Sequence, residues 1–257
     1  MLASLRNIFG RSPQTNAFRT VNGGSPSDIW LYDRPLAGLI GDSDQFPSIL
    51  LLQPQNWFKT LNAGSWVTQD GHPAMGRLST VATTNSQAWG ILSKDGGTTG
   101  WLPFQVTSAG DILRARIQVK VDSVANSQVI FGFAGNAAPW NAGAINTVNG
   151  AYWRSSAGGA MTAELVKAST RTAATAGPAG TFTAMADATW MTLGILLNKD
   201  THAVQYYLND QLVLSQTTLT NMPLTSTQLS LILGVNPQTN AIRTLDYRRP
   251  YAVQEAA

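Results

Sequence analysis

Residues 191–214 read MTLGILLNKDTHAVQYYLNDQLVL, and this stretch decides the fold class. Apolar residues recur at every second position on both sides of the polar segment 198–202. Side chains alternate between the two faces of a β-strand, so this period of two predicts two half-buried strands. Asn209 and Asp210 then suit a two-residue hairpin turn, and Leu212 and Leu214 continue the pattern beyond it. The stretch therefore predicts an antiparallel meander of three strands.

The same alternation recurs in segments on either side of this meander. Residues 111–122, DILRARIQVKVD, place apolar side chains on one face and charged or amide side chains on the other. Residues 128–134, QVIFGFA, follow a short polar turn and are interpreted as the partner strand, and residues 228–235 alternate again. The Ala-, Gly- and Thr-rich stretch 140–180 is interpreted as long surface loops. Many short strands between frequent turn signals are typical of a sandwich or a barrel.

The composition excludes several kinds of chemistry. The chain of 257 residues has no cysteine, which excludes disulfides, thiolate metal sites and cysteine nucleophiles. Charged residues make up 12%, about half of the usual ~25%, so the polar surface must come mainly from Thr, Asn, Gln and Ser. No apolar run approaches the roughly 20 residues of a membrane-spanning helix, and no membrane partner is expected.

The first 56 residues differ from the rest of the chain. They hold five prolines and several glycines, a density that does not sustain a central strand. The net charge of +3 also lies here, because residues 1–27 carry three arginines and no acid, whereas the remainder holds 14 basic and 14 acidic side chains. We therefore expect an extended arm over residues 1–56, with a short amphipathic helix at 2–9, ahead of a β-sandwich domain over residues 57–257. The arm residues expected to hold a partner are Arg6, Arg11, Phe18, Arg19, Trp30 and Tyr32.

Four segments resemble the concanavalin A-like and laminin-G-like sandwich domains. They are NGAYWR at 149–154, ATWMTLGILLNKD at 188–200, VQYYLNDQLV at 204–213 and TLDYRRPYAVQ at 244–254. They follow the family's order of a Trp-x-x-Leu-x-Ile strand, a strand ending in a tight hairpin, and an Asp-containing last strand. Asp210 stands where the family often has glycine. The resemblance implies an all-β fold, an antiparallel β-sandwich of the jelly-roll, concanavalin A-like type.

This fold hosts enzymes, lectins and coat proteins, so individual residues must separate these functions. A glycanase of this kind needs two carboxylates facing one cleft. Glu164 has no acidic neighbour two or four positions away, and closely spaced aspartates occur only in the arm. Asn136 and Asn141 share one loop without the aspartate that a calcium site would need. We therefore predict that the chain is not an enzyme and has neither a metal site nor a cofactor.

The loop composition and the arm ahead of one sandwich resemble structural proteins of tailed bacteriophages. On that resemblance we expect a virion protein, a capsid decoration or cement protein on the outer surface of the head, made in the host cytoplasm. Its expected partners are the major capsid protein and sister copies of itself, with a homotrimer favoured. Nucleic acid is not an expected partner, because three arginines without interleaved aromatic residues give little grip on phosphates.

The alternative is a tail-associated, lectin-like receptor-binding protein that recognises carbohydrate. Sugar binding needs exposed aromatic platforms, and the candidates are Trp101, Trp140 and Trp153. Trp190 begins a core strand and is interpreted as a packing residue.

One short phrase occurs near both ends of the chain. PQTNAFRT at 13–20 and PQTNAIRT at 237–244 are identical at seven of eight positions. In the first interpretation the two copies occupy equivalent edges, so that the arm of one subunit adds a strand where another subunit presents its closing strand. In the second they are similar turns without a shared role, and the sequence leaves both open.

Overall fold

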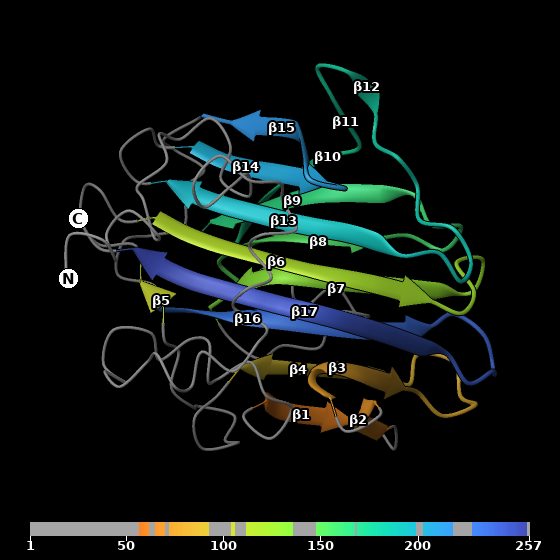
Figure 1. Ribbon diagram of the computed structural model, residues 1–257. Coiled ribbons are helices and arrows are strands. Elements are labelled where there is room, and N and C mark those ends of the chain that lie inside the picture. The colour runs from red at the N-terminus through yellow and green to blue at the C-terminus, as the bar shows by residue number, and fades with distance from the viewer. Residues whose placement is uncertain are drawn as a thin grey trace, which may run out of the picture. The chain divides into compact units, whose positions relative to one another are not determined.

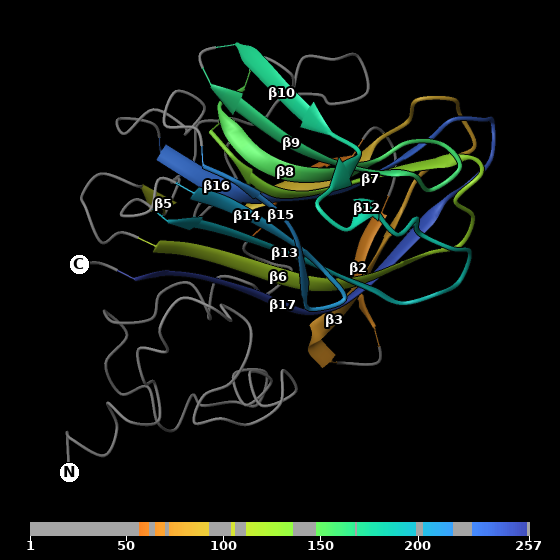
Figure 2. The same ribbon diagram turned by 90° about the horizontal axis from the view of Figure 1, so that it is seen from above.

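The computed structural model describes residues 57–61, 65–69, 72–92, 104–105, 112–135, 148–167, 169–198, 203–217 and 228–255, all within the unit Ser48–Ala257. These residues form two antiparallel sheets packed face to face (Figures 1 and 2). The predicted all-β sandwich is therefore confirmed. Among the described residues no helix is long and apolar enough to cross a membrane. The expected arm, its helix at 2–9 and the first copy of the repeat lie outside the described residues.

Sheet A, as we call the first sheet, has its strands in an order that differs from their order in the chain. The spatial order is β1 (Trp57–Leu61), β4 (Ala88–Leu92), β16 (Gln228–Pro237), β7 (Ser127–Ala134), β8 (Gly150–Ser155), β9 (Met161–Lys167) and β10 (Thr170–Ala174). The short strand β5 (Phe104–Gln105) pairs with one end of β16.

Sheet B forms the other layer. Its order is β15 (Gln211–Gln216), β14 (Ala203–Leu208), β13 (Met191–Asn198), β6 (Ile112–Val121), β17 (Thr244–Glu255), β3 (His72–Ser79) and β2 (Ser65–Gln69). A small hairpin of β11 (Ala176–Gly177) and β12 (Gly180–Thr181) contacts β15.

The hydrophobic core lies between the two sheets, where each strand places every second side chain. Apolar side chains buried there include Val129, Phe131, Phe133, Ala151, Trp153, Ala163, Leu165, Leu229, Leu231 and Leu233 from sheet A and Leu113, Ala115, Ile117, Val119, Leu193, Ile195, Leu197, Val204, Tyr206, Leu245 and Tyr247 from sheet B. Alternation sends the intervening residues of both sheets to the outer faces, where the polar side chains lie.

Two aromatic side chains tie the sheets together across this core. The indole Nε1 of Trp153 donates a hydrogen bond to the carbonyl oxygen of Gly194 at 3.0 Å. The hydroxyl of Tyr206 donates to the carbonyl oxygen of Glu164 at 2.7 Å. The rings of Trp153 and Tyr206 meet edge to face, with their centroids 5.3 Å apart. Each polar group is thus satisfied within an otherwise apolar layer.

The meander predicted from residues 191–214 is confirmed as β13, β14 and β15. Its turn residues Asn209 and Asp210 have φ values of 48° and 66°, the left-handed conformation that a type I′ hairpin turn requires at both positions. The strands predicted at 111–122 and 228–235 are also present, as β6 and β16.

Two predictions about the strands are wrong. β7 is not the partner of β6, because β6 pairs with β13 and β17 in sheet B whereas β7 pairs with β16 and β8 in sheet A. The connection between them therefore crosses from one sheet to the other. The stretch 140–180 is not a set of loops, since it contains β8 to β12. Its Ala and Gly residues have weak strand preference of their own, and β8, β9 and β10 are held in the sheet by successive pairing, beginning with β8 beside β7.

The second copy of the repeat, residues 237–244, forms the connection between β16 and β17. The side-chain oxygen of Asn240 accepts hydrogen bonds from the backbone nitrogen and the hydroxyl of Thr84, at 2.8 and 2.7 Å. β17 pairs with β6 from Leu245 to Glu255 and with β3 from Thr244 to Arg248. Because the first copy of the repeat lies outside the described residues, both interpretations of the repeat stay predictions.

Candidate functional site

The structure describes one of the three tryptophans predicted to bind sugar. Trp153 lies in the core between the sheets with 0% of its surface exposed, and its ring also packs edge to face against Phe182. The prediction for Trp153 is therefore wrong, because a sugar needs an accessible ring. The alternation along NGAYWR could have indicated that Trp153 is buried, since it places Trp153 on the same strand face as Ala151. The other predicted site residues lie outside the described residues: Trp101, Trp140, Arg6, Arg11, Phe18, Arg19, Trp30 and Tyr32.

Trp190, interpreted from the sequence as a packing residue, is the half-buried tryptophan of the described outer surface of sheet B. It directly precedes β13, at the end of the turn that leads into this strand. The ammonium of Lys120 lies 5.0 Å from the centroid of its ring, and the guanidinium of Arg248 lies 4.2 Å from it. Cations at these distances are attracted to the electron-rich face of an indole.

Strand register explains why these side chains meet. Lys120 in β6 lies opposite Asp246 in β17, and Asp246 lies opposite Arg77 in β3. Gln118 and Arg248 face each other in the next outward row, and Arg248 Nε donates to Gln118 Oε1 at 2.7 Å. Outward side chains on neighbouring strands lie about 5 Å apart, so these two rows form one surface. We call Arg77, Gln118, Lys120, Trp190, Asp246 and Arg248 the Trp190 patch.

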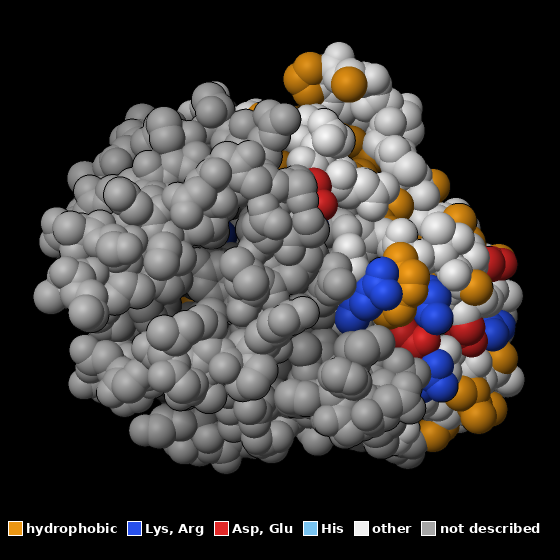
Figure 3. Space-filling view, in the orientation of Figure 1, with side chains coloured by type: hydrophobic (Ala, Val, Ile, Leu, Met, Phe, Trp, Pro, Cys, Tyr) orange, Lys and Arg blue, Asp and Glu red, His pale blue; other side chains and the backbone are white. Residues whose placement is uncertain are grey.

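The Trp190 patch carries a net positive charge. Arg77 donates to both carboxylate oxygens of Asp246, at 2.5 and 2.9 Å, and the Lys120 nitrogen lies 3.2 Å from one of them. Burial by itself would raise the pKa of Asp246, but the hydrogen bonds from Arg77 and Lys120 outweigh it and hold this pKa below its ordinary value. The patch thus holds one ionised carboxylate, Asp246, and three cations, Arg77, Lys120 and Arg248. Figure 3 shows acidic, basic and hydrophobic side chains gathered on this face.

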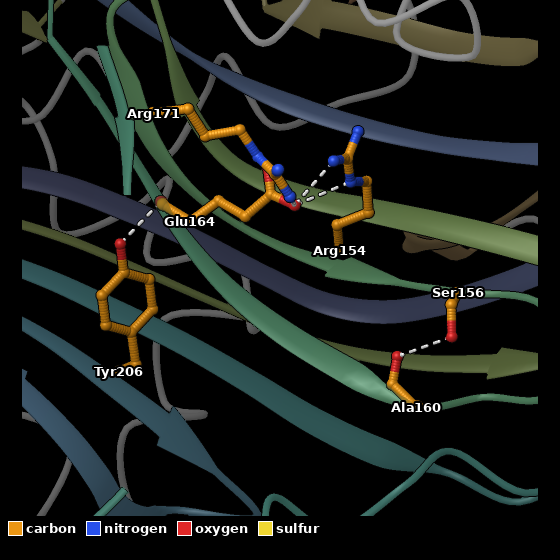
Figure 4. A network of polar contacts seen from close by, with 6 residues as sticks. All are labelled: Arg154, Ser156, Ala160, Glu164, Arg171 and Tyr206. Atoms are coloured by element: carbon orange, nitrogen blue, oxygen red, sulfur yellow. Dashed lines mark hydrogen bonds and ion pairs between the residues drawn. The ribbon is translucent and has the colours of Figure 1, made fainter. Parts of the chain in front are cut away.

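A second polar cluster lies on the outer face of sheet A (Figure 4). Glu164 in β9 has 0% of its surface exposed, and it forms ion pairs with Arg154 in β8 and Arg171 in β10. Tyr152 lies opposite Glu164 in the neighbouring strand. Burial, and then the charge of Glu164, raises the pKa of Tyr152 far above its ordinary value, so this phenol stays neutral. We call Arg154 and Arg171 the guanidinium pair, and Glu164 is the carboxylate that they share.

The carboxylates at the centre of both clusters are held by cations. Glu164 contacts two guanidiniums, and Asp246 contacts a guanidinium and an ammonium. Within the part of the chain that the structure describes, there is also no group of three or more His, Cys, Asp or Glu residues that could hold a metal ion. The arrangement is suited to holding charged side chains in place on the two outer surfaces.

Solved structures share this fold. The Emp46p carbohydrate recognition domain in its potassium-bound form matches with a TM-score of 0.50 and 12% identity, over 83% of this chain and 94% of that one. Alginate lyase AlgAT5 from polysaccharide lyase family 7 matches with a TM-score of 0.48 and 11% identity, over 74% and 82% of the two chains. The carbohydrate-binding module CBM66 from Bacillus subtilis matches with a TM-score of 0.40 and 10% identity, over 77% and 94%. At 12% identity, the likeness to the recognition domain establishes a common fold and no function.

No protein-family model matches the sequence, and no curated protein matches it.

The sequence contained part of the signal for the Trp190 patch. The alternation in 111–122 already placed Gln118 and Lys120 on the polar face of one strand. It did not reveal that Trp190 and Arg248 would lie beside them, because β13 and β17 flank β6 only through pairings between distant parts of the chain.

Proposed function

We propose that this chain is a non-catalytic binding domain that recognises carbohydrate at the Trp190 patch. The observation that carries the proposal is the half-buried Trp190 ring, set among cationic and amide side chains on the outer face of sheet B. The fold, shared with a carbohydrate recognition domain, is compatible with this function but does not establish it.

The side chains of the patch match what a sugar presents. An indole offers a flat apolar surface to the C–H groups of a sugar ring. The amide of Gln118 and the guanidinium of Arg248 offer planar hydrogen-bonding groups within reach of such a ring. The excess of positive charge favours a sugar that carries a carboxylate or sulfate group over a neutral one. The ligand class we infer is therefore an acidic glycan.

A catalytic role receives less support from the same geometry. General acid–base catalysis of glycan cleavage needs a carboxyl group that can give or take a proton beside the substrate. Glu164 and Asp246 are each engaged with two cationic side chains. We therefore propose binding without turnover.

The capsid decoration role, the homotrimer and the virion location stay predictions from the sequence. They depend on the arm, whose residues lie outside the described part of the chain. The tail-associated position of the lectin-like alternative likewise stays a prediction. The binding chemistry proposed for the Trp190 patch does not depend on either location.

The test is a glycan array probed with the full chain, followed by titration calorimetry with the strongest ligand. We expect acidic glycans among the ligands. Trp190→Ala should weaken binding at least about tenfold, which corresponds to ~1.4 kcal/mol. Trp190→Tyr keeps an aromatic ring and should retain part of the affinity.

Leu212→Ala is the matched control, because it removes an apolar side chain that is 49% exposed on the same sheet at β15, outside the patch. This variant should bind as tightly as the unmodified chain. Circular dichroism establishes that each variant is folded. Absence of ligands on the array, or equal affinity of Trp190→Ala and the unmodified chain, would overturn the proposal.

A further inference from the structure

The guanidinium pair on sheet A has hydrogen-bonding capacity that its carboxylate does not use. Arg154 contacts Glu164 through Nε and Nη2, at 2.8 Å each, and Arg171 does so through Nε at 2.9 Å and Nη2 at 2.6 Å. The remaining terminal nitrogen of each, Nη1, has no hydrogen-bond partner within the described residues. Figure 4 shows one terminal nitrogen of Arg154 pointing away from the carboxylate.

The two guanidiniums are also close neighbours. Both Nη2 atoms contact the same carboxylate oxygen, Oε1 of Glu164, which fixes them side by side. Two positive charges meet one negative charge, so the cluster keeps a net charge of +1. The Arg154 side chain is only 18% exposed and Glu164 is fully buried, so water screens this charge less than it would at an open surface.

The backbone beneath the cluster is held from the other side. The hydroxyl of Tyr206 donates to the carbonyl oxygen of Glu164 through the core. Arg154, Glu164 and Arg171 lie on the consecutive paired strands β8, β9 and β10. A ligand would therefore meet guanidiniums that are already oriented, which lowers the entropy lost on binding.

We propose that the guanidinium pair binds one oxyanion group, namely a carboxylate, a sulfate or a phosphate, through the donors that Glu164 leaves unused. Guanidinium forks match the geometry of such groups and form charge-assisted hydrogen bonds with them. This site lies on sheet A, whereas the Trp190 patch lies on sheet B, so the inference stands apart from the proposed function. A purely structural ion-pair cluster would have no preference for an added anion.

The experiment is titration of the full chain with sulfate, phosphate and acetate, each in separate arms against chloride at equal ionic strength, by calorimetry. We expect saturable binding of at least one oxyanion, and the three arms identify which group it is. Arg171→Gln should reduce that affinity at least tenfold. The control Lys167→Gln removes a positive charge from the same β9–β10 hairpin outside the cluster, and it should leave the affinity unchanged.

Glu164→Gln should change the affinity for the oxyanion in the opposite direction to Arg171→Gln. This variant leaves two guanidiniums without their carboxylate, so it should bind the oxyanion more tightly and gain more thermal stability from it than the unmodified chain. Trp190→Ala, which should weaken carbohydrate binding, should leave oxyanion binding unchanged, and this separates the result from the carbohydrate test. Absence of saturable binding in all three arms, or equal losses in Arg171→Gln and Lys167→Gln, would overturn the inference. Equal stabilisation of Glu164→Gln and the unmodified chain by the oxyanion would also overturn it.

Discussion

The hydroxyl of Tyr206 offers a direct measure of how strongly the two sheets are tied together. Tyr206→Phe removes the hydroxyl group of this side chain, and with it the buried hydrogen bond of 2.7 Å that the hydroxyl donates to the carbonyl oxygen of Glu164. The ring itself remains, so its edge-to-face contact with Trp153 and its packing in the core are retained. The substitution therefore isolates one cross-sheet hydrogen bond.

Its expected cost follows from burial. A typical intramolecular hydrogen bond contributes about 0.5–1.5 kcal/mol, and leaving a buried partner less satisfied adds to the loss. Tyr206 is fully buried, so we expect Tyr206→Phe to lower the free energy of unfolding by about 1–2 kcal/mol. For a domain of this size, about 2–4 °C of melting temperature corresponds to each kcal/mol, which predicts a fall of roughly 2–8 °C.

The assay is urea unfolding followed by tryptophan fluorescence, and the slope of free energy against urea should stay unchanged. Tyr207→Phe is the matched control, because its hydroxyl donates to the side chain of Gln205 within the same strand. Burial raises the pKa of Tyr206 well above its ordinary value and that of Tyr207 to about 12, so both phenols are neutral at pH 7. The reasoning fails if Tyr206→Phe costs no more than Tyr207→Phe.

Two further predictions concern sheet B. The pKa of Asp246 lies below its ordinary value, so its stabilising contribution is present above the unfolded-state pKa of about 4 and is lost as the pH falls through the folded-state pKa. Asp246→Asn should therefore lower the free energy of unfolding by about 1 kcal/mol at pH 7, a small value because Arg77 is 41% exposed. The difference in stability between this variant and the unmodified chain should shrink below pH ~4. A difference that stays constant with pH in denaturant titrations would contradict this. Gly76 lies opposite the buried Tyr247, and a methyl group at position 76 would collide with the tyrosine ring. Gly76→Ala should therefore destabilise the fold by about 1–3 kcal/mol. A melting temperature equal to that of the unmodified chain would refute the clash.

The fold class could be predicted from the sequence because its signals are local. Alternation in 191–214 and 111–122 requires only neighbouring residues, and the turn at Asn209 and Asp210 requires only two residues that tolerate positive φ. These signals predicted β6, β13, β14, β15 and β16 together with the faces that their side chains occupy. They could not predict that β6 and β7 belong to different sheets, since both strands alternate in the same way.

Which polar residues meet at the candidate sites was decided by tertiary structure. Arg77 and Asp246 are 169 residues apart in the chain, yet they form a two-point ion pair because β17 lies beside β3. The pairing of β6 with both β13 and β17 brings Arg248 to Trp190, while the position of β8 in sheet A turns Trp153 into the core. Period-two alternation shows which side chains share a face of one strand, but strand order is selected by packing the whole set of apolar faces into a single core. For this reason the alternation in the sequence determined strands with one apolar and one polar face, the resemblance to concanavalin A-like domains implied the sandwich, and only the folded chain determined which polar residues meet on its outer faces.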